Sequence, residues 1–486
     1  MRTCIPAGAK NSYKRLLVPS LILLLIGITT PVWACYAVIA GKNATVDGSV
    51  MVAHNEQNGG LRIVNFHRIP RLKFGEGDTL YLRRGGVLPQ VQDTHAFFWS
   101  ENPGLEFSDA YCNEYGVAVV SDRCPTREDD YDSLVNRGEI RDGGIGYMLR
   151  RLIVQRAKSA KEGVQIAGRL VERFGYIDTG RTYVIADTDE VWLMAVVRGR
   201  RWIAQRVPDD AVVLLPNVHI IGEVDLKDSA NFLAAPDIIE YAVKRGWFDP
   251  DGAESFSFRK VYRAQRDAKP DPRQYRGQCI VMNQTPSSLP EAPLPWAVVP
   301  PRKLSVSDMI EILRDRQSSH SICTPTTQEA AVFQLRGDIP REIGCVYWRT
   351  TAEPSISTFT PWYMGITQTP DNYYLTSDTE TRLSLEHHFS PPPDTFTLDI
   401  NKAWWKFLTL QNLVHQDYEN RIKVTRTTWD NFEDQLFKKQ KEIEKQALKL
   451  FKINPAAARA FLTKYCAEIA QQACQKADAL IQELKK

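Results

Sequence analysis

Residues 35–53 read Cys-Tyr-Ala-Val-Ile-Ala-Gly-Lys-Asn-Ala-Thr-Val-Asp-Gly-Ser-Val-Met-Val-Ala. This stretch begins with an apolar run, turns at Gly41-Lys42-Asn43, resumes at Thr45 and turns again at Asp47-Gly48 before more apolar residues. Glycine-containing turns between runs rich in β-branched residues are typical of connections between antiparallel strands. We therefore predict a β-hairpin that begins at Cys35.

Two later stretches repeat the strand pattern, residues 111–121 and residues 182–197, and the second turns at residues 187–189. Between them, residues 146–174 carry apolar side chains three or four positions apart, which indicates helices with one buried face. This mixture predicts an α+β protein in which sheet packs on sheet and helices lie outside.

The composition changes near residue 400, where helix-forming residues begin to dominate. A proline-rich connection over residues 286–301 precedes a helix that begins near Ser305, and Asn454-Pro455 is typical of the N-cap and first turn of a last helix. We predict three regions, which are a leader over residues 1–34, a body over residues 35–400, and a helical extension over residues 401–486 that packs on the body.

The leader has the order of features of a secretory signal peptide. Basic residues precede an apolar run over residues 16–28, and Val32 and Ala34 supply small side chains at the −3 and −1 positions of a cut after Ala34. We therefore expect a secreted or periplasmic protein whose mature chain begins at Cys35. An uncleaved anchor is the alternative, but the apolar run is short for a membrane span, and we expect no membrane insertion after processing.

Charge and cysteine content restrict the partners and the chemistry. The 486 residues contain 61 basic and 58 acidic side chains, and this balance does not indicate nucleic acid as a partner. Of nine cysteines, eight follow the leader, and an exported protein permits disulfides. We expect Cys112 and Cys124 as the first pair to test. No Cys-x-x-Cys pair occurs, and we expect no metal site.

A cysteine at a chain terminus has its own proton acceptor. The thiolate is the reactive form of the side chain, and an ordinary thiol is ionised only to a few per cent at neutral pH. The α-amine of the same residue titrates at a pKa of about 7.7–8.0 and lies within reach of the thiol. Cys35 is therefore a candidate nucleophile, with a diacylated lipid anchor or an ordinary buried strand residue as alternatives.

Residues 35–57 resemble the opening of the PepD-like dipeptidases, which are cysteine members of the N-terminal-nucleophile (Ntn) hydrolases. The resemblance continues in order to about Tyr418, in four further blocks at residues 111–118, 202–219, 327–336 and 359–365. It implies a four-layer αββα sandwich and hydrolysis of a small peptide through a thioester on Cys35. It implies no metal and no organic cofactor.

The resemblance also implies roles for individual residues. Asn217 is expected to donate its side-chain amide to the oxyanion of the reaction. Asn55, Asn113 and a later arginine are expected to contact the substrate. We take Arg276 as that arginine, and Arg259 and Arg263 are alternatives that the sequence does not separate.

The sequence departs from the family pattern beside the nucleophile. The family has Arg-Asn-Asp/Glu-Asp where this chain has His54-Asn55-Glu56-Gln57. His54 replaces a permanent cation by one that ordinarily titrates near neutrality, and Gln57 carries no charge. We therefore expect either that Glu56 replaces the missing acid through a shift of the hairpin or that His54 acts as the base, and both are candidate catalytic residues. A weak or altered enzyme is the alternative.

Two other functions remain compatible with these residues. The same mechanism would serve an N-acyl amide hydrolase of the penicillin or bile-salt acylase type. A lipid-anchored, non-catalytic binding protein on the same fold is the third interpretation, and the departures at His54 and Gln57 support it. The charged C-terminal helices are compatible with contacts in a homo-oligomer.

Overall fold

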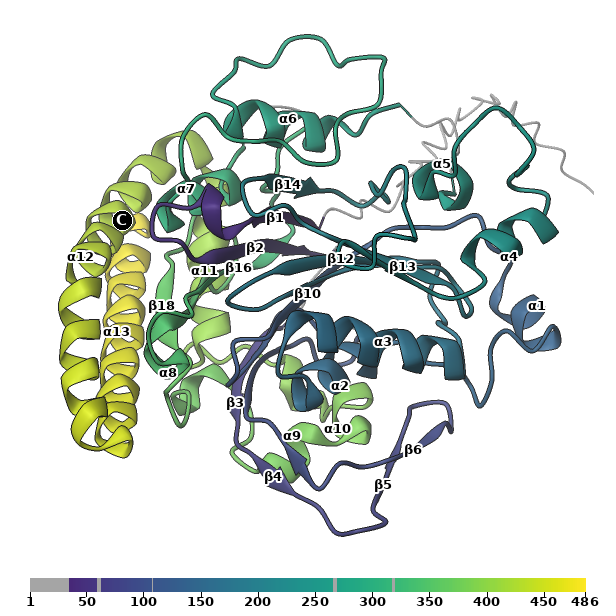
Figure 1. Cartoon of the computed structure of the whole chain (residues 1–486). Coiled ribbons are helices and arrows are strands. Elements are labelled where there is room, and N and C mark those ends of the chain that lie inside the picture. The colour runs from purple at the N-terminus through teal and green to yellow at the C-terminus, as the bar shows by residue number, and fades with distance from the viewer. Residues whose placement is uncertain (1–34, 59–62, 107, 265–268, 317–319) are drawn as a thin grey trace, which may run out of the picture. The chain divides into compact units, whose positions relative to one another are not determined.

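The hairpin predicted at Cys35 lies in the middle of a six-stranded sheet (Figure 1). The computed structural model describes residues 35–58, 63–106, 108–264, 269–316 and 320–486, so the predicted leader lies outside the described residues. Strands β1 (Tyr36–Ala40) and β2 (Val50–Gln57) pair antiparallel, which confirms the hairpin. The second strand begins at Val50 and not at Thr45, because Asp47 accepts hydrogen bonds from the backbone and hydroxyl of Ser49 and Gly48 has a φ of 73°.

The six strands of this first sheet pair antiparallel throughout. In sheet order they are β14 (Val212–Leu215), β1, β2, β16 (Thr327–Leu335), β17 (Cys345–Arg349) and β18 (Thr360–Tyr363). β1 and β2 are completely buried, because strands pack on both sides of them within the sheet and other layers cover both faces. The hairpin is therefore the centre of the sheet and not its edge.

A second, eight-stranded sheet contains the other predicted strands. In sheet order it consists of β15 (Phe232–Ala234), β13 (Trp202–Arg206), β12 (Val191–Val196), β11 (Arg181–Ala186), β10 (Ala118–Arg123), β9 (Tyr111–Asn113), β8 (Phe97–Glu101) and β3 (Asn65–Ile69). Two small ribbons accompany it, β4 (Leu72–Lys73) with β7 (Asp93–Thr94) and β5 (Thr79–Tyr81) with β6 (Val87–Pro89).

Helices cover the outer face of each sheet (Figure 1). α2 (Met148–Arg156) and α3 (Ala160–Phe174) pack on the eight-stranded sheet, in the segment where the apolar spacing predicts helices. α6 (Pro272–Val281) and α7 (Val306–Leu313) pack on the six-stranded sheet. The short helices are α1 (Tyr131–Asn136), α4 (Ile238–Lys244), α5 (Phe258–Tyr262), α8 (Arg341–Gly344), α9 (Thr379–Leu383), α10 (Leu385–Phe389) and the 3₁₀ turns Lys42–Ala44, Asp371–Tyr373 and Pro393–Phe396.

The layers therefore follow the order helix, sheet, sheet, helix, which confirms the predicted αββα sandwich. Apolar side chains from the inner faces of both sheets form one core, and a second core lies between the eight-stranded sheet and helices α2 and α3. Side chains alternate between the two faces of a strand. In β2, this alternation directs His54 and Glu56 into the layer between the sheets and directs Asn55 and Gln57 toward α7.

The last three helices, α11 (Ala403–Gln416), α12 (Tyr418–Ile453) and α13 (Pro455–Leu484), pack beside the six-stranded sheet, where α13 contacts β18. Two buried ion pairs connect them to the body, Arg314 with Glu433 at 2.6 Å and Arg336 with Glu444 at 2.6 Å. Within the described residues, no helix is long and apolar enough to cross a membrane. The boundary at residue 400 stays a prediction.

The expected disulfide between Cys112 and Cys124 is not formed. All eight cysteines of the described residues are free and buried. Cys112 pairs in register with Ala118, and Cys124 follows the end of the same strand, six residues beyond Ala118. At about 3.3 Å per residue, the two thiols lie about 20 Å apart along the sheet, which no disulfide can span.

We predict that Glu433 holds the C-terminal helices on the body. Glu433 accepts hydrogen bonds from Arg314, the hydroxyl of Thr358 and the backbone amide of Phe359. Glu433→Ala therefore removes the buried carboxylate partner of Arg314 and leaves the exposed Glu311 as its remaining ion pair. The free energy of unfolding should fall by about 3–5 kcal/mol, measured by chemical denaturation. The control is Glu468→Ala, which removes an exposed pair with Lys464 and should cost less than about 1 kcal/mol. Equal losses in the two variants would contradict the prediction.

Candidate active site

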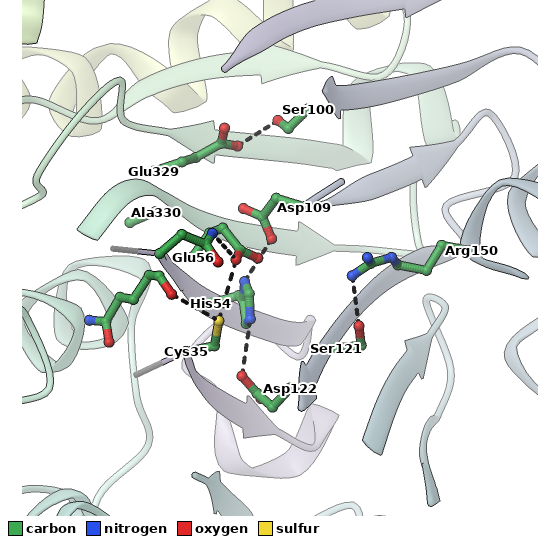
Figure 2. Close-up of polar contacts among 12 residues, drawn as sticks. Cys35, His54, Glu56, Ser100, Asp109, Ser121, Asp122, Arg150, Glu329 and Ala330 are labelled. Carbon is green, nitrogen blue, oxygen red and sulfur yellow. Dashed lines mark hydrogen bonds and ion pairs between the residues drawn. The ribbon is translucent and has the colours of Figure 1, made fainter. Parts of the chain in front are cut away.

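The thiol of Cys35 lies beside the carboxyl group of Glu56 in the layer between the two sheets (Figure 2). Its Sγ lies 3.4 Å from Glu56 Oε1 and 3.7 Å from the carbonyl oxygen of Gln57. Cys35 precedes β1 and Glu56 is near the end of β2, and the register of the hairpin pairs Tyr36 with Asn55. Cys35 therefore meets Glu56 because each is the next residue along its strand.

His54 lies between two aspartates and is completely buried with them (Figure 2). Its Nδ1 is 2.9 Å from Asp109 Oδ1, and its Nε2 is 3.3 Å from Asp122 Oδ1. Burial alone would lower the pKa of His54, but the two carboxylates raise that pKa well above its ordinary value. His54 is therefore an imidazolium, and neither nitrogen is free to accept a proton from Cys35.

Cys35 lies in an unfavourable environment for a thiolate. Burial, followed by the charges of Glu56 and Asp122, raises the pKa of Cys35 well above its ordinary value. Burial and the charge of Asp109 raise the pKa of Glu56 to about 7. Glu56 is therefore a proton acceptor whose charge changes near neutral pH, within reach of a thiol that needs one.

Arg273 contacts both Asn217 and the backbone of Cys35. Asn217 follows β14, and its amide nitrogen donates to the carbonyl of Arg123 at 3.1 Å. Arg273, in the first turn of α6, donates to the carbonyl oxygen of Cys35 at 3.3 Å and to Asn217 Oδ1 at 2.9 Å. Because the Asn217 side chain offers two N–H donors, one N–H is not used by the Arg123 carbonyl.

Two arginines, one in the eight-stranded sheet and one in the helix that packs on it, bring positive charge toward the layer that contains the thiol. Arg181 in β11 donates to the carbonyl and hydroxyl oxygens of Ser121, and its charge lowers the pKa of Cys35 against the larger effect of burial. Arg150 in α2 donates to the same hydroxyl at 2.7 Å (Figure 2). Arg181 lies on the opposite sheet from the hairpin and Arg150 lies on a helix that covers that sheet, so the packing of the layers brings both cations toward the site.

Three residues that are expected to contact the substrate have other contacts, and so does Gln57. Asn55 donates to the carbonyls of Leu313 and Ile322, and Gln57 donates to Ile322 and Thr327, because the alternation of β2 directs both toward α7. Asn113 donates to the carbonyls of Val154 and Ala157 behind the eight-stranded sheet. Arg276 pairs with Asp315 at 2.6 Å. These contacts give no support to substrate binding by Asn55, Asn113 or Arg276, and that role stays a prediction.

The sequence reasoning missed Asp109, Asp122 and Arg273. Asp122 gave little signal, because it lies between Ser121 and Arg123 at the polar end of β10, and only the structure shows that it is completely buried. Asp109 lies two residues before β9, and nothing in its local sequence distinguishes it. Asp271-Pro272 marks the start of α6, and Asp271 caps it, but only the docking of that helix places Arg273 at Cys35.

The same side chains have the donor types of a transition-metal site. Ligand atoms of Cys35, His54 and Asp122 lie within 4.8 Å of one another, and so do those of His54, Glu56 and Asp109. A histidine binds a metal ion through a neutral ring nitrogen. Each ring nitrogen of His54 already faces a carboxylate. The two aspartates therefore fit a cationic histidine better than a metal-bound one.

Comparison with known proteins agrees with a hydrolytic site. The model of peptidase family C69 matches residues 101–431, more than half of the chain. A probable dipeptidase of Salmonella dublin is 26% identical over 369 residues, which are 68% of this chain and 81% of the relative. A probable dipeptidase of Latilactobacillus sakei is 24% identical over 378 residues, 70% of this chain and 76% of the relative. The solved penicillin V acylase of Agrobacterium tumefaciens has a TM-score of 0.34 at 12% identity and covers 68% of this chain and 86% of its own.

We predict that Glu56→Gln changes the pH dependence of stability. The folded pKa of Glu56 lies near 7, above its ordinary 4.5, so its stabilising contribution is present below pH 4.5 and is lost as pH rises through 7. The wild type should lose about 3 kcal/mol of unfolding free energy over this range relative to Glu56→Gln. Denaturation at a series of pH values measures the difference. The exposed Glu254→Gln serves as control, and parallel pH curves for the wild type and Glu56→Gln would refute the assignment.

Proposed function

Since the chain belongs to peptidase family C69, we propose that it is a dipeptidase whose nucleophile is the Cys35 thiol, freed at the N-terminus when residues 1–34 are removed. The contact between Cys35 Sγ and Glu56 Oε1 carries this proposal. The family match begins after both residues, so their assignment depends on this geometry and on the resemblance of residues 35–57. The names of the relatives suggest a dipeptide as substrate.

The environment of Cys35 supports activation by cleavage. With residue 34 attached, burial and the nearby carboxylates keep the thiol protonated. Removal of the leader creates an α-amine, which brings positive charge and a proton acceptor to Cys35 itself. Glu56 and Asp122 are the carboxylates that would stabilise the ammonium form. The acid that relatives have at position 57 is thus replaced by Glu56, which reaches Cys35 without any shift of the hairpin.

The reaction has two steps. In the first, the α-amine or Glu56 takes the proton of the Cys35 thiol, the thiolate attacks the peptide carbonyl, and the resulting tetrahedral intermediate expels the amine of the second amino acid, which takes up a proton. In the second, water attacks the thioester carbonyl, loses a proton to the same base, and releases the first amino acid as a carboxylic acid, which restores the thiol.

Asn217 and Arg273 support the oxyanion. The N–H of Asn217 that the Arg123 carbonyl does not use would donate to the carbonyl oxygen as negative charge develops there, an interaction typically worth about 3 kcal/mol of barrier. Arg273 fixes the amide by donating to its oxygen, which leaves the nitrogen as the end of the side chain that can face substrate.

His54 supplies the cation that an arginine supplies in relatives. Because Asp109 and Asp122 hold it as an imidazolium, its charge persists above the pH at which histidine ordinarily titrates. A cation near the thiol favours the thiolate. This role differs from the base that the sequence allowed, because both nitrogens of His54 are already committed to carboxylates.

We also propose that the protein is exported, because residues 1–34 have the composition of a signal peptide and the same cut would expose the nucleophile. One cleavage would then couple export to activation. The protein would be inactive before it leaves the cytosol.

Cys35→Ala in the mature protein should reduce hydrolysis of dipeptides to background. The substitution removes the nucleophile and one sulfur atom, so the free energy of unfolding should change by no more than about 2 kcal/mol. Release of free amino acids and a thermal melt measure the two effects. Cys112→Ala is the matched control, since it also removes a buried free thiol but lies away from Glu56. Residual dipeptide hydrolysis by Cys35→Ala, or its loss in Cys112→Ala, would refute the nucleophile.

Mass spectrometry of the protein recovered from the exporting cell tests the processing. We expect a mass that begins at unmodified Cys35, and rapid alkylation of that thiol near neutral pH. The chain that retains residues 1–34 should alkylate slowly at Cys35, since burial and two carboxylates raise its pKa. A mass increased by a diacylglycerol, or an active chain that still begins at Met1, would contradict the proposal.

A further inference from the structure

A cavity of about 520 Å³ is lined by residues that are chain neighbours of Asn217 and Arg273, the two residues of the proposed oxyanion site. We name it the α5–α6 cavity, because Arg259 of α5, Arg263 at the end of α5, and Asp271 and Gln274 at the start of α6 form its walls. Val218 and His219, the two residues after Asn217, also line it. Asp271 and Gln274 flank Arg273, which contacts both Asn217 and Cys35. Several wall residues of the cavity are therefore chain neighbours of the residues that contact each other beside the nucleophile.

Two arginines in this cavity lack a carboxylate partner. Within the described residues, no carboxylate oxygen lies within 4.0 Å of the guanidinium of Arg259 or Arg263. Arg259 donates to the carbonyl oxygen of Leu294 at 3.1 Å, and Glu223 acts on it only from a greater distance. Burial lowers the pKa of both arginines, and the charge of Arg259 lowers the pKa of Arg263 further. Two cations thus repel each other in a half-buried space.

Among the other charged residues that line the cavity, Asp271 raises the pKa of Arg263 against the larger effect of burial, but the two form no ion pair. Glu254 is exposed and pairs with Lys260 at 3.3 Å. Asp271 caps α6, where one of its oxygens accepts from the backbone amides of Arg273 and Gln274. Glu291 is exposed and Lys269 adds a further positive charge.

The remaining wall residue that titrates, His219, adds no negative charge either. Its Nδ1 lies 3.0 Å from the hydroxyl of Thr182, and burial and Arg263 lower its pKa to about 3, so it is neutral. Unpaired, partly desolvated guanidinium groups bind carboxylates strongly and with defined geometry.

We propose that Arg263, assisted by Arg259, binds the terminal carboxylate of the substrate in the α5–α6 cavity. This inference rests on the proposed dipeptidase function, because a dipeptide carries its carboxylate on the leaving amino acid, a few bonds from the attacked carbonyl. The proposal explains why a dipeptide is accepted. The carboxylate must reach the arginines while the carbonyl lies at Cys35 and Asn217, so a longer chain would place an uncharged peptide group in the cavity.

The test separates binding from turnover by using Cys35→Ala, which holds substrate without cleaving it. Calorimetry compares a neutral dipeptide with its C-terminal amide, which has the same peptide bond but no carboxylate. We expect the amide to bind about tenfold more weakly or worse. Adding Arg263→Gln should weaken dipeptide binding by the same factor and leave amide binding within about twofold. The control Arg302→Gln, which removes an exposed arginine paired with Asp308, should change neither.

Three results would decide whether the α5–α6 cavity binds the substrate carboxylate. Equal binding of dipeptide and amide to Cys35→Ala, or equal weakening of both by Arg263→Gln, overturns the carboxylate site. Selective loss of dipeptide binding in Arg263→Gln supports the carboxylate site. This holds even if the mature wild type hydrolyses neither the dipeptide nor its amide, because absence of hydrolysis would overturn only the dipeptidase function. Arg263→Gln should melt no lower than its parent, because it removes an unpaired, half-buried cation. Arg263→Lys, which keeps the charge without the planar fork, should restore part of the discrimination.

Discussion

Ionised carboxyl groups in the layer between the two sheets require cations beside them. Glu56, Asp109 and Asp122 are all fully buried there, and a buried carboxylate without a partner costs several kcal/mol. His54 faces two of them, and this arrangement fixes the charge of the histidine, the orientation of its ring and the distance between the two sheets at this point. The site is thus a structural ion cluster as well as a candidate catalytic centre.

A second buried cluster extends this polar layer. Glu329, which pairs in register with Glu56, accepts hydrogen bonds from Ser100 and Tyr347 and forms an ion pair with Arg349 at 2.8 Å. Burial, and to a smaller extent the charge of Glu329, raises the pKa of Asp109. The layer therefore contains several negative groups on neighbouring strands. Asp109 and Asp122 face His54, and Glu329 pairs with Arg349. Glu56 accepts from the Asn58 amide and the Cys35 thiol. Loss of one cation would raise the pKa of the carboxyl groups beside it.

The substitution of histidine for arginine beside the nucleophile has a physical explanation in this setting. An isolated histidine would lose its charge near neutral pH, and the site would lose its cation. Asp109 and Asp122 prevent this by stabilising the imidazolium from both sides. Glu56 stands at a position where the family pattern also has an acid, and it faces Cys35 because strand alternation directs residue 56, and not residue 57, to the inner face.

Helix α6 connects the nucleophile with the proposed substrate cavity. Its first turn contributes Arg273 to Cys35 and Asn217, and its N-cap Asp271 forms part of the cavity wall. The hydroxyl of Tyr36 in turn donates to the carbonyl of Arg273 at 3.0 Å. The position of α6 on β1 therefore sets both the oxyanion donor and the place where a substrate carboxylate would be bound.

The sequence by itself determined the central hairpin, the αββα class, helices α2 and α3, and the cysteine that heads β1. These features follow from periodicity, turn residues and the resemblance of ordered blocks, all of which are local or linear. Only the tertiary structure decided which partners meet Cys35. Asp109, Asp122 and Arg273 come from segments 74 to 238 residues away, and no local pattern encodes their approach. It also decided that Cys112 and Cys124 stay apart and that Asn55 and Asn113 face helices, because strand register and layer packing fix the direction of each side chain.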